Sequence, residues 1–539
     1  MSFLKHNTPM TSLANRIGNT LTEFPDRVLI ADATQTWTGR DVAQKISEIE
    51  KFLQVSTLPG SIVGVCFPSL AYMGLAILAV IKSGRVPVIL SHTDLLQQPK
   101  TWLERVPMDL LLTTGELKVL SHSFVNTLEL TEGGEIIVDV INKNALARVR
   151  APEGTALILY TSGSTGVPKG VCVPEEGITS TCNFLTEYFD LSPETVTPIV
   201  LPVCHSMALN TQFLPTFLAG GQSIFMESRL EINRIFRHIT GHNSTFVSLI
   251  GEVLRVCWDE MTRRKLPPNL TVKHVQLAGG LISKKHLQMA SELFPNALIH
   301  KGYGLTEAIR VTMIDHRDPL FLQNVVGTPL PFQTIEIRHP DNRRALPGES
   351  GEIFVKGPNV MLGILGTALT SVASDGFLGT GDLGSLNEKG QLEVLGRKDS
   401  IFKLNGVKVS GVEIETVATS VSSYVREAKC ILVEDQRQVR NKIILFLEVS
   451  KDLESEFYKN YFEIFHTALW SEFKNLTYFP KDIIILQKFP RTNNGKLAIS
   501  ELHNIWKTQN SKSLIQNPRG AFMFYKDVGS LTDSYKENQ

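Results

Sequence analysis

The sequence predicts an α/β protein with a large N-terminal domain of mostly parallel sheets flanked by helices and a small α+β C-terminal domain. From about residue 10 to 300, strand-like apolar runs such as SIVGVCF and ALILYTS alternate with helix-like segments such as AYMGLAILAVIKSG. This alternation is typical of parallel strands joined by helices. The chain has 539 residues, which is too long for a single hydrophobic core, so we expect at least two domains.

The pattern changes beyond residue 300. From about 327 to 395, short strand-like runs (TIEIRH, GEIFVKG and GQLEVLG) alternate with Gly, Pro and Asn turns, which predicts a β-rich subdomain. From 396 to about 510, runs such as CILVED and KIILFLEV alternate with helical patterns, which predicts the small α+β domain. We therefore predict a large domain over 1–395 and a small domain over 396–510. A polar tail of unassigned structure follows over 511–539.

The composition is that of an ordinary globular enzyme and points to a cytoplasmic protein. Lys plus Arg and Asp plus Glu each number 54, so no long-range field favours a nucleic-acid partner. The six cysteines show no C-x-x-C pair, which is typical of reduced thiols in the cytosol. The most apolar segment, from Tyr72 to Ile81, is shorter than the ~18 residues of a membrane span. We predict that it is a buried helix.

A Ser/Thr/Gly cluster follows the predicted strand at LILYTSGSTGVPKGV, residues 157–171. Backbone N–H groups, hydroxyls and the ammonium of Lys169 would form a concave donor surface suited to phosphate oxygens. The cluster is not the common phosphate loop, because Pro168 stands where that motif needs its second glycine. A polar turn between two strands explains the cluster equally well, and the loop alone does not decide between the two interpretations.

Three further stretches carry residue types suited to a nucleotide. In KGYGLTEAIR (301–310), Tyr303 could stack on a purine, Thr306 could bind a phosphate and Glu307 could hold Mg²⁺. A glycine-rich strand end with a capping threonine is the simpler alternative. GTGDLG (379–384) matches the dinucleotide fingerprint in letters only, because a turn precedes it and a probable hairpin follows.

Asp382 in GTGDLG could accept hydrogen bonds from a sugar diol, although taken alone an Asx turn is the favoured interpretation. Near the C-terminus, FPRTNNGKLAI places Lys496 at the tip of an Asn-Asn-Gly turn. Most turn lysines are merely solvated, so neither residue alone identifies a site.

Together, five stretches resemble the adenylate-forming superfamily of acyl-CoA synthetases, nonribosomal-peptide adenylation domains and beetle luciferases. They occur in that family's order and approximate spacing: YTSGSTGVPKG, GYGLTE, GTGDLG, GRKDSIFKLNG and RTNNGK. The resemblance extends from about residue 15 to 507. It implies a nucleotide-binding ligase that uses ATP and Mg²⁺ and has a mobile C-terminal domain hinged at Asp399.

The resemblance implies which residues bind the nucleotide. The pyrophosphate portion would be held by the loop residues Thr161, Ser162, Gly163, Ser164, Thr165, Gly166 and Lys169. Adenine would be framed by Gly279, Gly280, Tyr303 and Gly304, and the ribose hydroxyls would contact Asp382 and Arg397.

The resemblance also implies catalytic roles. Lys496 matches the family's catalytic lysine, Thr306 would bind the α-phosphate and Glu307 would be the Mg²⁺ ligand. Lys403 matches a lysine that serves thioester formation. His205 resembles the gate beside the carboxylate pocket, although a packed structural histidine explains it nearly as well.

The implied reaction converts a carboxylic acid and ATP to an acyl-adenylate and pyrophosphate, then transfers the acyl group to a thiol. The acceptor would be coenzyme A or the phosphopantetheine of a separate carrier protein, and an amine acceptor or a non-catalytic nucleotide-binding role are alternatives. Relatives that activate amino acids carry an aspartate where this chain has Ser206, so we predict an acid without an α-amino group. Ile364 also departs from the G-Y that follows VMLG in many relatives.

Overall fold

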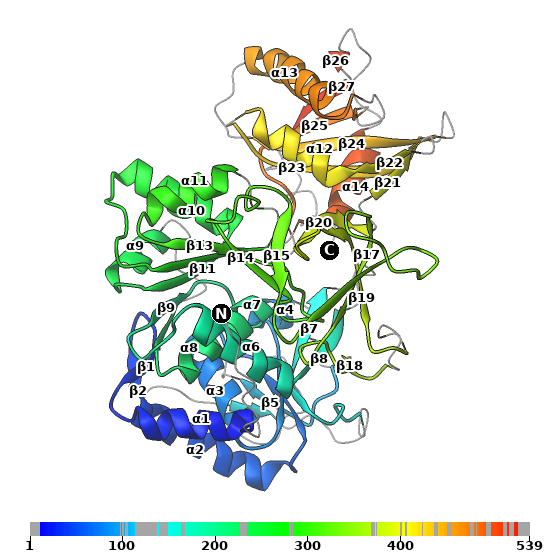
Figure 1. Ribbon diagram of the computed structural model, residues 1–539. Helices are drawn as coiled ribbons and strands as arrows, with labels where there is room; N and C mark the ends of the chain where they lie inside the picture. The colour runs from blue at the N-terminus through cyan, green and yellow to red at the C-terminus, as the bar shows by residue number, and fades with distance from the viewer. Residues whose placement is uncertain are drawn as a thin grey trace. The chain divides into compact units, whose positions relative to one another are not determined.

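The chain divides into two compact units in the computed structural model (Figure 1). The first unit comprises residues 1–380 and 385–393, and the second comprises 381–384 and 394–539. The structure describes residues 11–526 outside these gaps: 98, 100–101, 103–105, 114–136, 140–148, 163–167, 227–233, 280–281, 283, 368–371, 373, 399–400, 405–406, 423, 436–439, 450–454, 475–478, 481, 492–496, 510–514 and 517–521.

A seven-stranded sheet in the first unit has the order β18-β8-β7-β4-β3-β5-β6. Its four central strands, β7, β4, β3 and β5, run parallel, and antiparallel strands lie at both edges. The strands are β3 (Ile62–Val65), β4 (Val86–Ile89), β5 (Leu110–Thr113), β6 (Ile137–Asp139), β7 (Thr155–Ser162), β8 (Pro168–Pro174) and β18 (Gly363–Ile364). The parallel centre is the arrangement that the alternating sequence pattern predicts.

A four-stranded sheet of the first unit has the order β2-β1-β10-β9, in which β1, β10 and β9 run parallel. Its strands are β1 (Val28–Ala31), β2 (Thr36–Thr38), β9 (Val196–Ile199) and β10 (Gln222–Phe225).

A nine-stranded sheet joins parallel and antiparallel strands in the order β11-β12-β13-β14-β15-β20-β19-β17-β16. The β-rich stretch thus continues a sheet whose first three strands are parallel. These strands are β11 (Phe246–Ile250), β12 (His274–Ala278), β13 (Leu298–Lys301), β14 (Thr312–Asp315), β15 (Val325–Pro329), β16 (Thr334–Arg338), β17 (Gly351–Lys356), β19 (Leu378–Leu386) and β20 (Leu392–Arg397).

The segment predicted to be a buried helix is α3, and the prediction is confirmed. Eleven of the twelve residues from Leu70 to Ile81 are buried, namely ten apolar side chains and Gly74, and Tyr72 is half-buried. Ser69 caps the helix by accepting the N–H of Tyr72 at 3.4 Å. No helix among the described residues is long and apolar enough to cross a bilayer.

The described helices of the first unit connect or flank these strands (Figure 1). They are α1 (Leu13–Glu23), α2 (Gly39–Ser56), α3 (Leu70–Lys82), α4 (His92–Gln97), α6 (Glu175–Tyr188), α7 (Ser206–Ala208), the π-helix η2 (Leu209–Phe213), α8 (Leu214–Leu218), α9 (Ile235–Gly241), α10 (Gly251–Arg264) and α11 (Lys284–Leu293).

The second unit contains a five-stranded sheet of order β23-β24-β25-β27-β26 and the hairpin β21-β22. Alternate residues of β24 pack on opposite faces: Leu445 contacts a cluster that includes residues of α12 and α13, and Phe446 contacts a cluster that includes residues of α14. The elements are β21 (Ile401–Leu404), β22 (Val407–Ser410), α12 (Gly411–Ser420), β23 (Val425–Asp435), β24 (Arg440–Val449), α13 (Ser455–Phe473), β25 (Asp482–Leu486), α14 (Ile499–Gln509), β26 (Ile515–Gln516) and β27 (Phe522–Lys526).

The stretch after residue 510, left unassigned from the sequence, contributes β26 and β27, and β27 pairs in parallel with β25. The α/β class with several sheets flanked by helices is confirmed. The predicted domain limits at 395 and 510 and the mobility of the C-terminal domain remain predictions.

Candidate functional site

The predicted phosphate loop connects two antiparallel strands, β7 and β8. Thr161 is the register partner of Lys169, and Ser162 is the partner of Pro168. Both pairs therefore lie at the loop end of the hairpin. Lys169 is exposed there, and Thr161 is half-buried. The side chain of Ser162 and the loop residues Gly163, Ser164, Thr165 and Gly166 lie outside the described residues.

The GYG segment forms a tight connection between β13 and β14. The carbonyl of Tyr303 accepts the N–H groups of Val311 at 2.7 Å and Thr312 at 3.2 Å, which folds the loop back on itself. A Cβ on Gly302 would overlap the carbonyl oxygen of Thr312, and one on Gly304 would lie 2.7 Å from the backbone nitrogen of Arg310. The close approach of backbone to backbone requires glycine at both positions.

The segment 359–365 ties the phosphate-loop hairpin to the GYG loop. The N–H of Met361 donates to the carbonyl of Glu307 at 2.8 Å, and the N–H of Leu365 donates to the carbonyl of Gly170 at 2.8 Å. Ile364, the departure noted in the sequence, lies in β18 and pairs with Val171. One short segment therefore holds the backbones of both predicted phosphate-binding loops.

The side chains of Thr306 and Glu307 carry polar atoms without a partner in the described part of the chain. Both residues are half-buried, and no hydrogen bond or ion pair joins either side chain to a described residue. The carboxylate of Glu307 offers oxygen ligands of the kind that Mg²⁺ prefers. No group of three metal-ligating side chains occurs within the described ranges. Mg²⁺ is commonly bound by one or two carboxylates together with substrate phosphates.

The strand β12 ends at the predicted adenine site. Gly279 follows that strand with a φ of +86°, and a Cβ there would lie 2.8 Å from Cγ2 of Ile250. Only glycine adopts this backbone conformation without strain. Gly280 lies outside the described residues.

The segment around His205 leads directly into the π-helix η2. His205 is half-buried and precedes α7. Ser206, predicted from the sequence to replace the aspartate of amino-acid-activating relatives, accepts a hydrogen bond from Nδ2 of Asn210 at 3.1 Å. Isolated π-helical turns occur frequently at functional sites.

Asp382 and Arg397, both predicted to contact ribose, lie side by side in the second unit. Nη1 of Arg397 donates to Oδ1 of Asp382 at 3.1 Å, and the Asp382 side chain is 12% exposed. Asp382 lies within strand β19, so the interpretation as an Asx turn is wrong. Lys403 lies in β21 with its side chain outside the described atoms, and Asp399 and Lys496 lie outside the described residues altogether.

Two residues of the site received no role from the sequence. Arg310 is 6% exposed and Asn359 is 1% exposed. Nδ2 of Asn359 donates to the carbonyl of Arg310 at 2.8 Å and also to the carbonyl of Ile309, which fixes the end of the GYG loop. The sequence signal that could have identified Arg310 is its position inside the otherwise mostly apolar run AIRVTMI.

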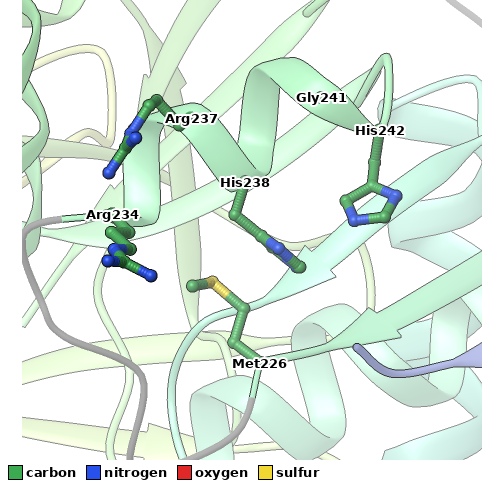
Figure 2. Close-up of a pocket in the computed structure, with 6 residues that line it drawn as sticks. All are labelled: Met226, Arg234, Arg237, His238, Gly241 and His242. Atoms are coloured by element: carbon green, nitrogen blue, oxygen red, sulfur yellow. The ribbon is translucent and has the colours of Figure 1, made fainter. Parts of the chain in front are cut away.

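A separate basic cavity of about 290 Å³ lies beside α9 (Figure 2). Burial and the neighbouring His242 lower the pKa of His238 to about 4. Nε of Arg237 lies 2.7 Å from Oε1 of the fully buried Glu260. The lining residues are Met226, Arg234, Arg237, His238, Gly241 and His242. None of these is a residue that the sequence singled out.

Comparison with known proteins matches residues 19–365 to the family of AMP-binding enzymes. The 2-succinylbenzoate–CoA ligase of Bacillus pumilus is 28% identical over 433 residues, which cover 77% of this chain and 83% of that protein. The D-alanine–D-alanyl carrier protein ligase of Bacillus licheniformis is 27% identical over 422 residues, which cover 73% and 82%.

Solved structures share the fold. O-succinylbenzoate coenzyme A synthetase from Bacillus subtilis, in complex with ATP and magnesium ion, is 23% identical with a TM-score of 0.74. The match covers 91% of this chain and 99% of that one.

Proposed function

Because the chain belongs to the AMP-binding enzymes and is an adenylate-forming ligase, we propose that it activates a carboxylic acid with ATP and transfers the acyl group to coenzyme A. The family membership confirms the resemblance found in the sequence. The observation that carries the proposal is the segment 359–365, which binds the backbones of Glu307 and Gly170 and so supports both loops proposed to handle phosphate.

In the first half-reaction, a carboxylate oxygen attacks the α-phosphorus of ATP, and the bond to pyrophosphate breaks. Both reactants are anions, so fixed cations must stabilise the charge that shifts in the transition state. Lys169 would bind the departing pyrophosphate, Thr306 would orient the α-phosphate and Lys496 would contact the reacting oxygens. Mg²⁺, when bound through Glu307, neutralises phosphate charge.

In the second half-reaction, the thiol sulfur attacks the acyl carbon, AMP leaves and the thiol proton passes to solvent. Lys403 and Lys496 belong to the same unit but are separated by 93 positions in the sequence. We propose that the second unit turns at Asp399 so that each lysine serves a different half-reaction. Such closure would also exclude water from the reactive mixed anhydride.

The names of the relatives support the choice of the acyl acceptor. Coenzyme A is proposed because it appears in the name of the Bacillus pumilus relative. A separate carrier protein is the second candidate, since the Bacillus licheniformis relative is named for one. Ser206 in place of aspartate leaves an α-ammonium without a carboxylate partner, so we propose an acid that has no α-amino group.

A cytoplasmic location is proposed from the cysteines. All six lie among the described residues and none forms a disulfide. Five of them are buried, and burial raises the pKa of Cys182 to about 12. Such thiols are inert and suit a reducing compartment.

The test of the proposed function is exchange of labelled pyrophosphate into ATP across a panel of aliphatic, aryl and amino acids. Release of AMP is then measured with coenzyme A, a carrier protein or an amine as acceptor. We expect exchange with plain acids and a thioester with coenzyme A. Lys169→Ala should weaken productive ATP use by ~1 to 3 kcal/mol, while the exposed turn residue changed in Lys389→Ala should not. Exchange with no acid would overturn the proposal.

A further inference from the structure

Arg310 is a buried arginine whose side chain has no partner in the described part of the chain. It is 6% exposed, its Nε is buried without a hydrogen bond, and no ion pair joins its guanidinium to any described carboxylate. Burial lowers its pKa to about 10, and the Tyr188 phenol only partly opposes that shift. The group therefore remains charged at neutral pH.

The guanidinium lies under the GYG loop. A Cβ built on Gly302 would lie 3.0 Å from Nη1 of Arg310, so this side chain reaches back to the end of β13. Arg310 itself has a φ of +45°, a left-handed conformation that is uncommon for a residue with a side chain. Glu307, the proposed Mg²⁺ ligand, is only three residues earlier in the sequence. The unpaired charge is thus beside the loop that is proposed to hold the reacting groups.

Polar residues also form a row across the three parallel strands that precede this loop. Ser248, Gln276 and His300 are register partners across β11, β12 and β13. Nε2 of Gln276 contacts Oγ1 of Thr211 in η2 at 3.5 Å. Oε1 of Gln276, Oγ of Ser248 and Oδ1 of Asn210 are buried without partners among the described residues. Buried polar atoms of this kind need a hydrogen-bond partner, which a polar ligand would supply and a hydrocarbon tail would not.

A buried charge without a counter-charge is costly, and proteins pair almost all such groups. A site that binds an anion avoids this cost in the complex, where the anion supplies the missing partner. A guanidinium is the side chain best suited to the task, because its fork of N–H donors matches the two oxygens of a carboxylate.

We propose that the acid activated by this enzyme carries a second carboxylate, which Arg310 binds while the first carboxylate reacts. The substrate class is therefore a dicarboxylic acid. This inference rests on the proposed function, because it assigns the far end of the same substrate.

The test compares matched pairs of acids in pyrophosphate exchange. Glutaric acid is compared with pentanoic acid, adipic acid with hexanoic acid, and each diacid with its monomethyl ester. We expect the preferred diacid to exceed both neutral partners in kcat/KM by about 100-fold, because a polar site rejects an analogue that leaves its groups unpaired. Equal or faster exchange with the neutral partners would overturn the inference.

Arg310→Met should abolish this preference by removing the charge and keeping the length of the side chain. The matched control is Arg317→Met, because Arg317 is exposed and pairs with Asp315 at 2.8 Å. That control should keep the preference of the wild-type enzyme. Should Arg310→Met fail to fold, the selectivity of the wild-type enzyme still decides the inference.

Thermal unfolding separates a failure of this inference from a failure of the proposed function. The same diacids, without ATP, should raise the unfolding temperature of the wild-type protein and of Arg317→Met but not of Arg310→Met. A shift without any exchange would reject the proposed ligase reaction and keep the Arg310 site. Exchange with neutral acids and no shift by any diacid would reject the Arg310 site and keep the ligase reaction.

Discussion

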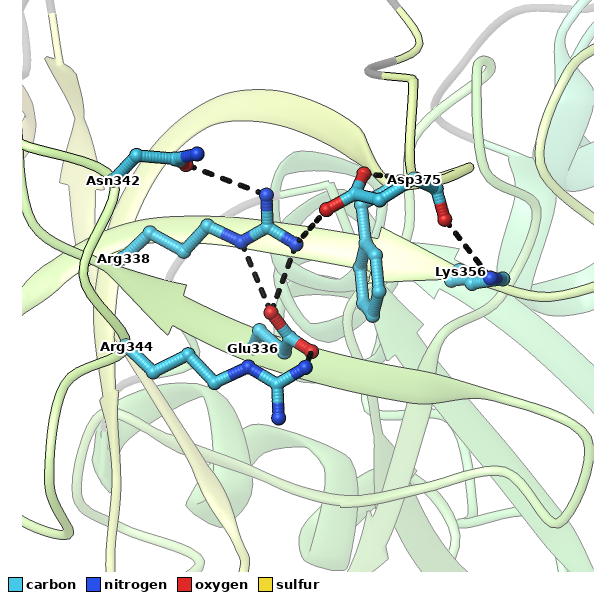
Figure 3. Close-up of polar contacts among 7 residues, drawn as sticks. Glu336, Arg338, Asn342, Arg344, Lys356 and Asp375 are labelled. Carbon is cyan, nitrogen blue, oxygen red and sulfur yellow. Dashed lines mark hydrogen bonds and ion pairs between the residues drawn. The ribbon is translucent and has the colours of Figure 1, made fainter.

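Two arginines of the first unit are buried to nearly the same extent, yet their surroundings differ. Arg338 is 4% exposed and Arg310 is 6% exposed. Nη2 of Arg338 lies 2.7 Å from Oδ2 of Asp375 and 2.8 Å from Oε2 of Glu336 (Figure 3). The rings of Phe354 and Phe377 are centred 4.5 and 4.7 Å from its guanidinium carbon. Arg310 has no such partner among the described residues.

The pKa values of the two arginines shift in opposite directions. Burial alone would lower the pKa of Arg338, but hydrogen bonds and ion pairs with Asp375 and Glu336 raise it. For Arg310, burial dominates and lowers the pKa to about 10. The first arginine is part of the fold, since its partners come from its own strand β16, from the adjacent strand β17 and from the segment before β19. The second lacks the partner that a substrate would bring.

Lys496→Ala should cause the largest loss of adenylation activity. It distinguishes the role of Lys496 in the reaction from the role of Arg310 in binding the second carboxylate. Loss of a preorganised charge at the reacting oxygens should reduce adenylation by about 100-fold or more. The loss should be the same for every acid, whereas Arg310→Met should affect only acids with a second carboxylate. The measurement is pyrophosphate exchange with a diacid and its neutral partner.

Transfer from chemically supplied acyl-adenylate to the thiol should survive in Lys496→Ala. Asp399→Pro should show the reverse pattern, because it fixes φ at the proposed hinge. A Lys496→Ala variant that loses activity with diacids only would contradict the separation of the two roles.

Asn359→Ala should have an intermediate effect, because it removes the donor that holds the backbone of Arg310. Two buried carbonyls would lose their donor, which should lower the free energy of unfolding by about 1 to 3 kcal/mol. It should also raise KM for the diacid more than for its neutral partner. Asn296→Ala is the control, since its amide makes an exposed contact with the carbonyl of Leu270. Unchanged selectivity in Asn359→Ala would show that the loop does not position Arg310.

The smallest expected effect is that of His300 on the pH dependence of the free energy of unfolding. Burial, followed by the neighbouring His274, lowers the pKa of His300 to about 3, whereas an unfolded histidine titrates near ~6.5. The unfolded chain then binds more protons below ~6.5, so this contribution to stability is complete above that pH and is lost as the pH falls toward 3. The other groups near His300 are Tyr188, Asp315, His316 and Arg317.

The free energy of unfolding of the wild-type protein should therefore decrease as the pH is lowered from about 7.5 to 5. The free energy of unfolding of His300→Gln should decrease less steeply over the same range. Selectivity for the diacid should stay constant over the same range, because the pKa of Arg310, about 10, lies well above it. Selectivity that titrates near pH 6.5 would mean that a histidine, not Arg310, holds the second carboxylate.

Much of this molecule can be predicted from sequence because periodic burial and short motifs are local signals. The alternating strands and helices, the buried α3 and the GYG loop follow from apolar spacing and from glycine. The ion pairs of Asp382 and Arg338, and the lack of one at Arg310 among the described residues, depend on which side chains the fold brings together. The sequence does not show whether a charged side chain has a partner, so it does not distinguish Arg310 from the other arginines.

The most direct measurement is the free energy of unfolding of Arg310→Met and Arg338→Met without substrate, by chemical denaturation. Arg338→Met removes one of the two arginines that pair with the buried Glu336, the other being the exposed Arg344, and it also removes the contact with Asp375. It should lower the free energy by about 1 to 3 kcal/mol. Arg310→Met removes an unpaired buried charge and should leave the value unchanged or raise it. If both variants lose stability equally, Arg310 has a structural partner, and the assignment of its charge to the substrate is wrong.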